Sequence, residues 1–131
     1  NFQFFTHLPV RITDINYGNH LGNDAVLGLL HEARMQFLKA AGYSELDLTG
    51  VGLIMADVAI EFKAEAFYGD VLTAFVAAGD FSKIGFDLYY KLVKGETETV
   101  VALAKTGMVC FDYKKRKVAA VPDEVFRNLV G

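Results

Sequence analysis

Cysteine, proline and long apolar runs are scarce in this chain of 131 residues. The single cysteine, Cys110, cannot form an internal disulfide, so nothing favours an oxidising compartment. No run reaches the length of about 18 apolar residues that suggests a membrane-spanning helix. No basic region followed by an apolar stretch opens the chain, so no signal peptide is predicted. We therefore expect a cytoplasmic protein with no membrane partner.

The composition excludes two further classes of protein. Hydrophobic residues make up 53% of the chain and charged residues 22%, which excludes a disordered chain. The net charge of −3 provides no overall basic surface for nucleic acid. The length predicts a single domain over residues 1–131. The hydrophobic fraction is slightly above that of a typical globular protein, so some apolar residues can line a subunit interface or an apolar substrate tunnel.

Hydrophobic periodicity predicts one long helix among strands. The helix begins near Asp24 and ends at Ala41, with Gly42 at the position after its C-terminus. It is apolar nearly all round, which is typical of a buried helix. The expected strands are antiparallel, and an antiparallel sheet around one helix is an α+β arrangement. Strands are expected at 2–13, 56–65, 71–78, 84–94 and 97–113, a hairpin turn at Gly95 and Glu96, and a short helix at 123–130.

A polar loop over residues 14–24 leads into the N-terminus of the long helix. Its Asn23 is a favourable N-cap, and free N–H groups at a helix start can polarise a carbonyl. Hydrolysis of an acyl group needs such donors for the oxyanion and a base for water. The alternative is a well-capped loop whose polar groups only satisfy its own backbone. Four polar side chains can converge here: Asp14, Asn16, His20 and Asn23.

The order of these motifs resembles the hotdog-fold thioesterases of the 4-hydroxybenzoyl-CoA and acyl-ACP thioesterase types. The matching pieces are Asp14-x-Asn16-x-x-x-His20-x-x-Asn23, then Glu32-Ala33-Arg34 in the helix, then Ile60-Glu61-Phe62 and Tyr68-Gly69-Asp70-Val71. The resemblance implies a hotdog fold, with an antiparallel sheet of five to six strands wrapped around one long buried helix. It also implies a homodimer or a dimer of dimers, with the thioesterase site at the dimer interface.

One position departs from the family pattern, because the usual catalytic aspartate is replaced by Asn16. An amide cannot accept the proton of water, so another group must serve as the base. Asp14, His20 and Glu32 are the candidates. Glu32 qualifies because a carboxylate on a largely apolar helix must face a partner or a cavity. Asn16 and His20 are expected to hold the water.

The basic run Lys114, Lys115, Arg116 and Lys117 has two interpretations. It is either a solvated turn or a contact for the phosphates of coenzyme A. Three scattered histidines and one cysteine show no metal-ligand spacing. No metal and no cofactor are therefore predicted.

These observations together predict an acyl thioesterase of fatty acid metabolism that acts on acyl-CoA or acyl-ACP. The acyl chain is expected along the buried helix, with the thioester carbonyl near the donors of residues 22–24. The alternative is a non-catalytic acyl-CoA-binding hotdog module, with Asn16 marking lost chemistry. A hydratase or dehydratase ranks last, because the His/Asp and His/Glu motifs usual in those enzymes are not recognisable here.

Overall fold

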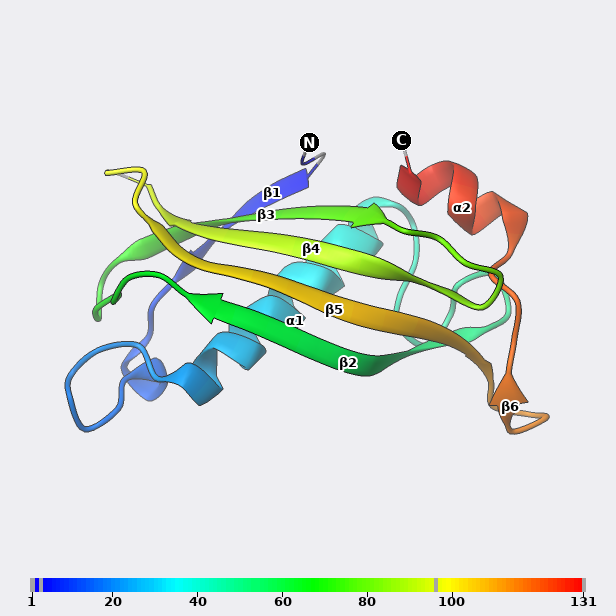
Figure 1. Ribbon diagram of the computed structural model, residues 1–131, viewed down its shortest axis with the longest axis horizontal. Helices are drawn as coiled ribbons and strands as arrows, with labels where there is room; N and C mark the ends of the chain where they lie inside the picture. The colour runs from blue at the N-terminus through cyan, green and yellow to red at the C-terminus, as the bar shows by residue number, and fades with distance from the viewer. Residues whose placement is uncertain (1, 3, 96, 131) are drawn as a thin grey trace.

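The computed structural model describes residue 2 and residues 4–95 and 97–130. Its described strands form one antiparallel sheet in the order β1-β3-β4-β5-β2, with β6 paired to β5. The long helix α1 lies across one face of this sheet (Figure 1). The predicted α+β architecture is confirmed. In chain order the elements are β1 (Phe4–Pro9), the 3-10 turn η1 (Ile12–Asp14), α1 (Asn23–Ala40), β2 (Gly52–Phe62), β3 (Val71–Gly79), β4 (Gly85–Lys94), β5 (Val100–Asp112), β6 (Lys117–Val118) and α2 (Asp123–Val130).

The first strand is shorter than the sequence predicts. The expected strand at 2–13 is wrong after Pro9, because the chain turns into η1. The carboxylate of Asp14 accepts a hydrogen bond from the backbone N–H of Arg11, at 2.8 Å. This local bond competes with an extended backbone, as aspartate side chains often do. Of the hairpin turn expected at Gly95 and Glu96, the second residue lies outside the described part of the chain.

Helix α1 begins and ends within one residue of the prediction. Gly42 has a φ of 90°, the left-handed conformation that glycine favours after a helix. The N-cap, however, is Gly22 and not Asn23. Gly22 has an extended backbone and no side chain to hydrogen-bond the first turn, and Asn23 is already the first helical residue.

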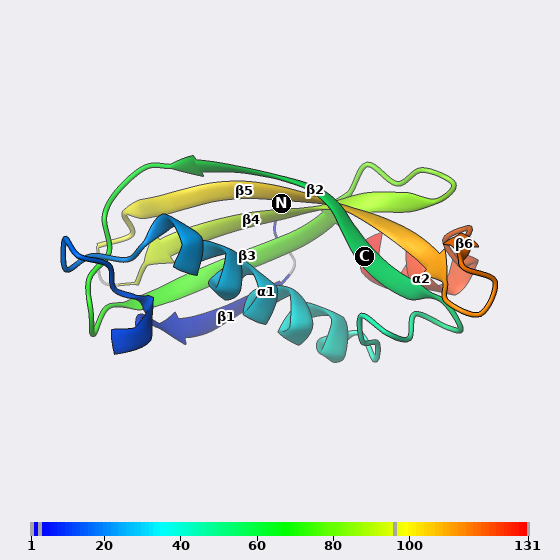
Figure 2. The same cartoon turned by 90° about the horizontal axis from the view of Figure 1, so that it is seen from below.

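Only one face of α1 is buried in this chain. Leu30, Ala33 and Leu38 are almost inaccessible and pack into the core. At its flanks, Leu27 on the β2 side is 42% exposed and Met35 on the β1 side is 40% exposed. Figure 2 shows α1 in front of the sheet, between β1 and β2 in this view. The sheet therefore covers one side of the long helix, and part of the helix surface stays exposed in the single chain.

Strand β2 is a long, open edge of the sheet. It pairs with β5 on one side and with no other strand of the described chain on the other. The apolar residues Ile54, Val58 and Phe62 along it are each at least 39% exposed. Natural sheets rarely leave such an edge uncovered, because it offers a template for another strand.

A polar cluster crosses the core between α1 and the middle of the sheet. The buried Arg34 donates hydrogen bonds to Glu45, at 2.5 Å, and to the hydroxyl of Tyr90, at 3.2 Å. His31 lies 3.0 Å from the other oxygen of Glu45. Burial disfavours the charge of the guanidinium, but these two hydrogen bonds outweigh burial and raise the pKa of Arg34. Burial also opposes ionisation of Glu45, but Arg34 and His31 lower the pKa of its carboxyl below the ordinary value.

Glu45→Gln is expected to lower the free energy of unfolding by about 3 kcal/mol at pH 7, because it leaves Arg34 buried without a counter-charge. Urea denaturation measures this change. The lowered pKa of Glu45 means that its ionic contribution is present above the ordinary value of 4.5 and is lost as the pH falls through the folded-state value. The difference between wild type and variant should therefore shrink in acid.

The matched control is Glu61→Gln, since Glu61 is a largely exposed carboxylate paired with Lys63. Exposed pairs contribute little, so this variant should unfold like wild type. Equal stability of the two variants at pH 7 would contradict a structural role for the Arg34–Glu45 pair.

Candidate functional site

The loop before α1 closes on itself through backbone hydrogen bonds. The N–H of Gly22 donates to the carbonyl of Asp14, and the N–H of Asn16 donates to the carbonyl of His20, each at 3.0 Å. The amide oxygen of Asn16 accepts the N–H of Gly18 at 2.9 Å. Asn19 supplies the left-handed residue of the turn, with a φ of 63°. The loop therefore presents His20 beside the start of α1.

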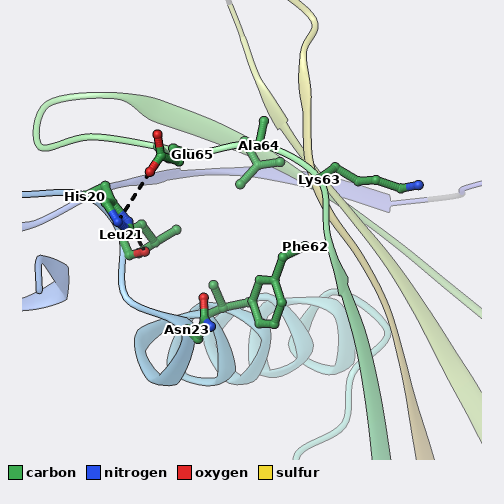
Figure 3. Close-up of a pocket in the computed structure, with 10 residues that line it drawn as sticks. His20, Leu21, Asn23, Phe62, Lys63, Ala64 and Glu65 are labelled. Carbon is green, nitrogen blue, oxygen red and sulfur yellow. Dashed lines mark hydrogen bonds and ion pairs between the residues drawn. The ribbon is translucent and has the colours of Figure 1, made fainter. Parts of the chain in front are cut away.

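His20 has a defined partner at each ring nitrogen (Figure 3). Its Nδ1 lies 3.2 Å from the carbonyl oxygen of Leu21. A carbonyl only accepts, so Nδ1 is the donor in this contact. Nε2 lies 3.3 Å from a carboxylate oxygen of Glu65, which also only accepts, so this second contact is an ion pair when Nε2 is protonated. The side chain of His20 is 31% exposed. The ring is oriented, accessible and next to a carboxylate.

His20 and Asn23 line a pocket of about 250 Å³. Phe62 at the end of β2 and the following residues 63–66 form its other wall, as Figure 3 shows. Among the described residues, none accepts a hydrogen bond from the backbone N–H of Asn23 or Asp24. Because the N-cap Gly22 has no side chain, these two donors stay available at the positive end of the helix.

Asn16 lies close to His20 across Gly18. A Cβ atom at Gly18 would be 3.1 Å from Nε2 of His20 and 3.4 Å from the amide oxygen of Asn16. Both side chains therefore flank the same small space, which glycine leaves open. The amide oxygen of Asn16 is engaged with Gly18, so its NH₂ group is the part left for another partner.

Asp14 is directed away from this pocket and towards Arg11. Its carboxylate is buried and accepts from the backbone N–H of Arg11 at 2.8 Å and from the guanidinium at 3.2 and 3.3 Å. These contacts occupy the carboxylate as a turn-forming group. The structure therefore does not place Asp14 beside His20 as a base.

Glu32 also lies elsewhere, in a groove between α1 and β1 that has a volume of about 870 Å³. Its carboxylate accepts a hydrogen bond from Gln36 at 2.6 Å, and Gln36 in turn contacts Thr6. Gln36 is therefore the polar partner that a carboxylate on this largely apolar helix needs. The structure does not bring Glu32 to the pocket of His20.

Lys114, Lys115 and Arg116 lie in an exposed turn between β5 and β6, and Lys117 is the first residue of β6. The carboxylate of Asp112 accepts the N–H groups of Lys114 and Lys115, at 2.9 and 3.0 Å, and fixes the backbone of the turn. Figures 1 and 2 place β6 and the N-terminal end of α1 at opposite ends of the molecule. The basic turn is therefore remote from the His20 pocket of its own chain.

Sequence reasoning missed Glu65, which it treated only as a polar position of a strand. Glu65 reaches His20 because Leu21 donates its N–H to the carbonyl of Ala66 at 2.7 Å and His20 pairs with Phe67. That pairing joins segments more than forty residues apart. The available signal was a carboxylate at the last position of the expected alternating strand, and it does not identify the partner.

Other reactive side chains offer no second centre. Among the described residues, no group of three His, Cys, Asp or Glu side chains could hold a metal ion. Burial raises the pKa of Cys110 to about 11, so its thiol is protonated and unreactive at neutral pH. No helix of the described chain is long and apolar enough to cross a membrane.

Comparison with known proteins gives consistent results. The model of the Thioesterase-like superfamily matches residues 10–129. A putative esterase from Aquifex aeolicus is 29% identical over 100 residues, which is 75% of each chain. A 1,4-dihydroxy-2-naphthoyl-CoA thioesterase from Synechocystis superposes with a TM-score of 0.86 at 23% identity, covering 97% of this chain and 94% of that one. The probable thioesterase YbaW from Escherichia coli gives 0.79 at 22% identity, covering 98% and 97%.

Asp14→Ala is expected to lower the free energy of unfolding by about 2 kcal/mol, because it removes the charged carboxylate that accepts the N–H and the guanidinium of Arg11. Urea denaturation followed by circular dichroism measures the change. Thr13→Ala in the same turn is the control and should unfold like wild type, since Thr13 is exposed. Equal stability of the Asp14 and Thr13 variants would show that the carboxylate does not hold the turn.

Proposed function

The chain belongs to the thioesterase-like superfamily, and on that premise we propose that it hydrolyses an acyl-CoA to the free acid and coenzyme A. Thioester hydrolysis is the general activity that family membership supports. The hotdog arrangement of sheet and helix agrees with it. The observation that carries the proposal is the oriented imidazole of His20 beside two free N–H groups at the start of α1.

In this proposal His20 is the general base. The Leu21 carbonyl holds the proton of the neutral ring at Nδ1, so Nε2 accepts a proton from water as the water oxygen attacks the thioester carbonyl carbon. Positive charge then develops on the ring, and Glu65 at 3.3 Å stabilises it. The NH₂ group of Asn16 helps to hold the water, which is a role that needs no carboxylate.

The start of α1 stabilises the negative oxygen of the intermediate. The backbone N–H groups of Asn23 and Asp24 donate to this oxygen, and the helix dipole favours its charge. When the carbon–sulfur bond breaks, the imidazolium of His20 returns the proton to the leaving thiolate. The products are the acid and the thiol, with all protons supplied by the one water molecule.

We propose further that the active form is a homodimer or larger assembly. The open edge of β2 suits antiparallel pairing with a second copy. Such a pairing reverses one copy relative to the other, so it brings the partner's turn of residues 114–117 towards the end of β2 that borders the His20 pocket. Coenzyme A phosphates in one pocket would then meet the cations of the other copy.

A non-catalytic acyl-CoA-binding module is the second candidate, and Asn16 is the observation that favours it. The family aspartate is absent there, and the amide oxygen of Asn16 is already engaged with Gly18. Release of thiol from a panel of acyl-CoA and acyl-ACP substrates decides between the two. Binding without turnover would support the module.

His20→Ala is expected to lower kcat by about 10²- to 10⁴-fold, because it removes the general base. Glu65→Gln should cost roughly fivefold, since the pair is largely exposed and worth about 1 kcal/mol. Thiol release measures both, with circular dichroism as the test of folding. Glu61→Gln changes a carboxylate outside the pocket and should keep the wild-type rate. A His20 variant within about twofold of wild type would refute this mechanism.

Static light scattering is expected to give at least twice the mass of one chain at micromolar concentration. Val58→Lys should weaken the assembly, because a charged side chain on an edge strand opposes pairing. Val71→Lys places the same charge on β3, away from this edge, and should leave the mass unchanged. A stable wild-type monomer would contradict the proposed role of β2.

A further inference from the structure

A second pocket lies between α1 and β2, further along the helix than His20. It has a volume of about 260 Å³. Leu27 and Met55 stand at its exposed rim, while Leu30, Arg34 and Thr106 are almost fully buried. An apolar pocket with a few buried polar groups at its base is the usual form of a small-molecule site.

The guanidinium of Arg34 is only partly used by the protein. Its side chain is 8% exposed and carries five N–H donors. One donor bonds Glu45 through Nε, and one bonds Tyr90 through Nη1. Among the described residues, no acceptor is present for Nη2. No unpartnered side-chain nitrogen of the described residues is shut off from solvent, so this donor is accessible, and Arg34 lines the pocket, where it can donate to an acceptor.

The hydroxyl of Thr106 is a second donor towards the same space. Tyr90 accepts from Arg34, and its hydroxyl lies 2.7 Å from that of Thr106; either oxygen can donate in this pair, and we assign the donor as Tyr90. That assignment leaves the hydroxyl proton of Thr106 free to point into the pocket it lines. The base of the pocket therefore presents hydrogen-bond donors, and a ligand with a hydrogen-bond acceptor fits it.

The charge of this cluster indicates that the acceptor is neutral. The positive charge of Arg34 is already balanced by Glu45 at 2.5 Å. His31, the other basic group facing Glu45, adds a charge only when protonated. A carboxylate in the pocket would meet a guanidinium that is already paired, whereas a hydroxyl or keto oxygen needs no counter-charge.

We propose that this pocket binds the far end of the acyl group and selects acyl groups that carry an uncharged oxygen there. The inference rests on the proposed thioesterase function. Both pockets lie between α1 and the region of β2, so one substrate can occupy both. Arg34 follows Asn23 by eleven residues, or roughly 16 Å along the axis, and its side chain leans back by about one turn of 5.4 Å. The distal oxygen is then roughly 10 Å from the thioester.

An acyl chain of eight carbons, with bonds of about 1.5 Å, spans roughly that length. The test therefore compares 8-hydroxyoctanoyl-CoA with octanoyl-CoA by kcat/KM for thiol release. Wild type should prefer the hydroxylated substrate by about tenfold, as two donors to one oxygen allow. Thr106→Val keeps the shape without the hydroxyl and should reduce this preference by about fivefold, the effect of one hydrogen bond.

Thr73→Val is the matched control, because Thr73 lies on β3 outside both pockets and should leave the preference unchanged. The wild-type comparison needs no variant, so misfolding of the Thr106 variant cannot hide the result. Equal kcat/KM values for the two substrates would overturn the inference while leaving thioesterase activity intact. Preference for the ω-carboxylated octanoyl-CoA would overturn the neutral acceptor. Failure to hydrolyse any of the three would instead count against the proposed function.

Discussion

The pairing of Leu21 with Ala66 is the contact on which the candidate site depends. The 2.7 Å backbone hydrogen bond ties the loop before α1 to the segment after β2. It brings His20 to Glu65 and places the start of the helix against Phe62. Leu21 and Ala66 are both buried, so this bond forms away from water and holds its geometry. Without it, the imidazole and the carboxylate would belong to two unrelated surface loops.

The nature of the helix start follows from the same loop. A serine or aspartate cap would take the N–H groups of the first turn with its own side chain. Gly22 cannot do this, and its own N–H is fixed on Asp14. The loop is thus rigid while the donors of Asn23 and Asp24 remain open. A helix that is less well capped is, for that reason, better suited to stabilise an oxyanion.

Local patterns predicted α1 and its termination at Gly42, because a helix and its C-terminal glycine are decided by neighbouring residues. The antiparallel strands followed from their period-two alternation. The pattern failed where longer-range contacts decide. The chain leaves β1 because the carboxylate of Asp14 accepts the backbone N–H of Arg11. Glu65 reaches His20 through a pairing of two segments that lie far apart in the sequence.

The exposed apolar residues of β2 also show what local sequence patterns cannot predict. Period-two alternation is typical of a strand with one face on a core, yet Val58 and Phe62 of β2 are exposed in the single chain. A hydrophobic pattern in the sequence indicates that a surface is covered, but it does not indicate whether the same chain or another one covers it. The exposed side of α1, with Leu27 and Met35, fits the same explanation. A strand and a helix face that are apolar but open are expected where a second copy or an acyl group completes the core. Leu27 lines the second pocket and Phe62 the first, so apolar residues that assembly could cover also border the candidate substrate pockets.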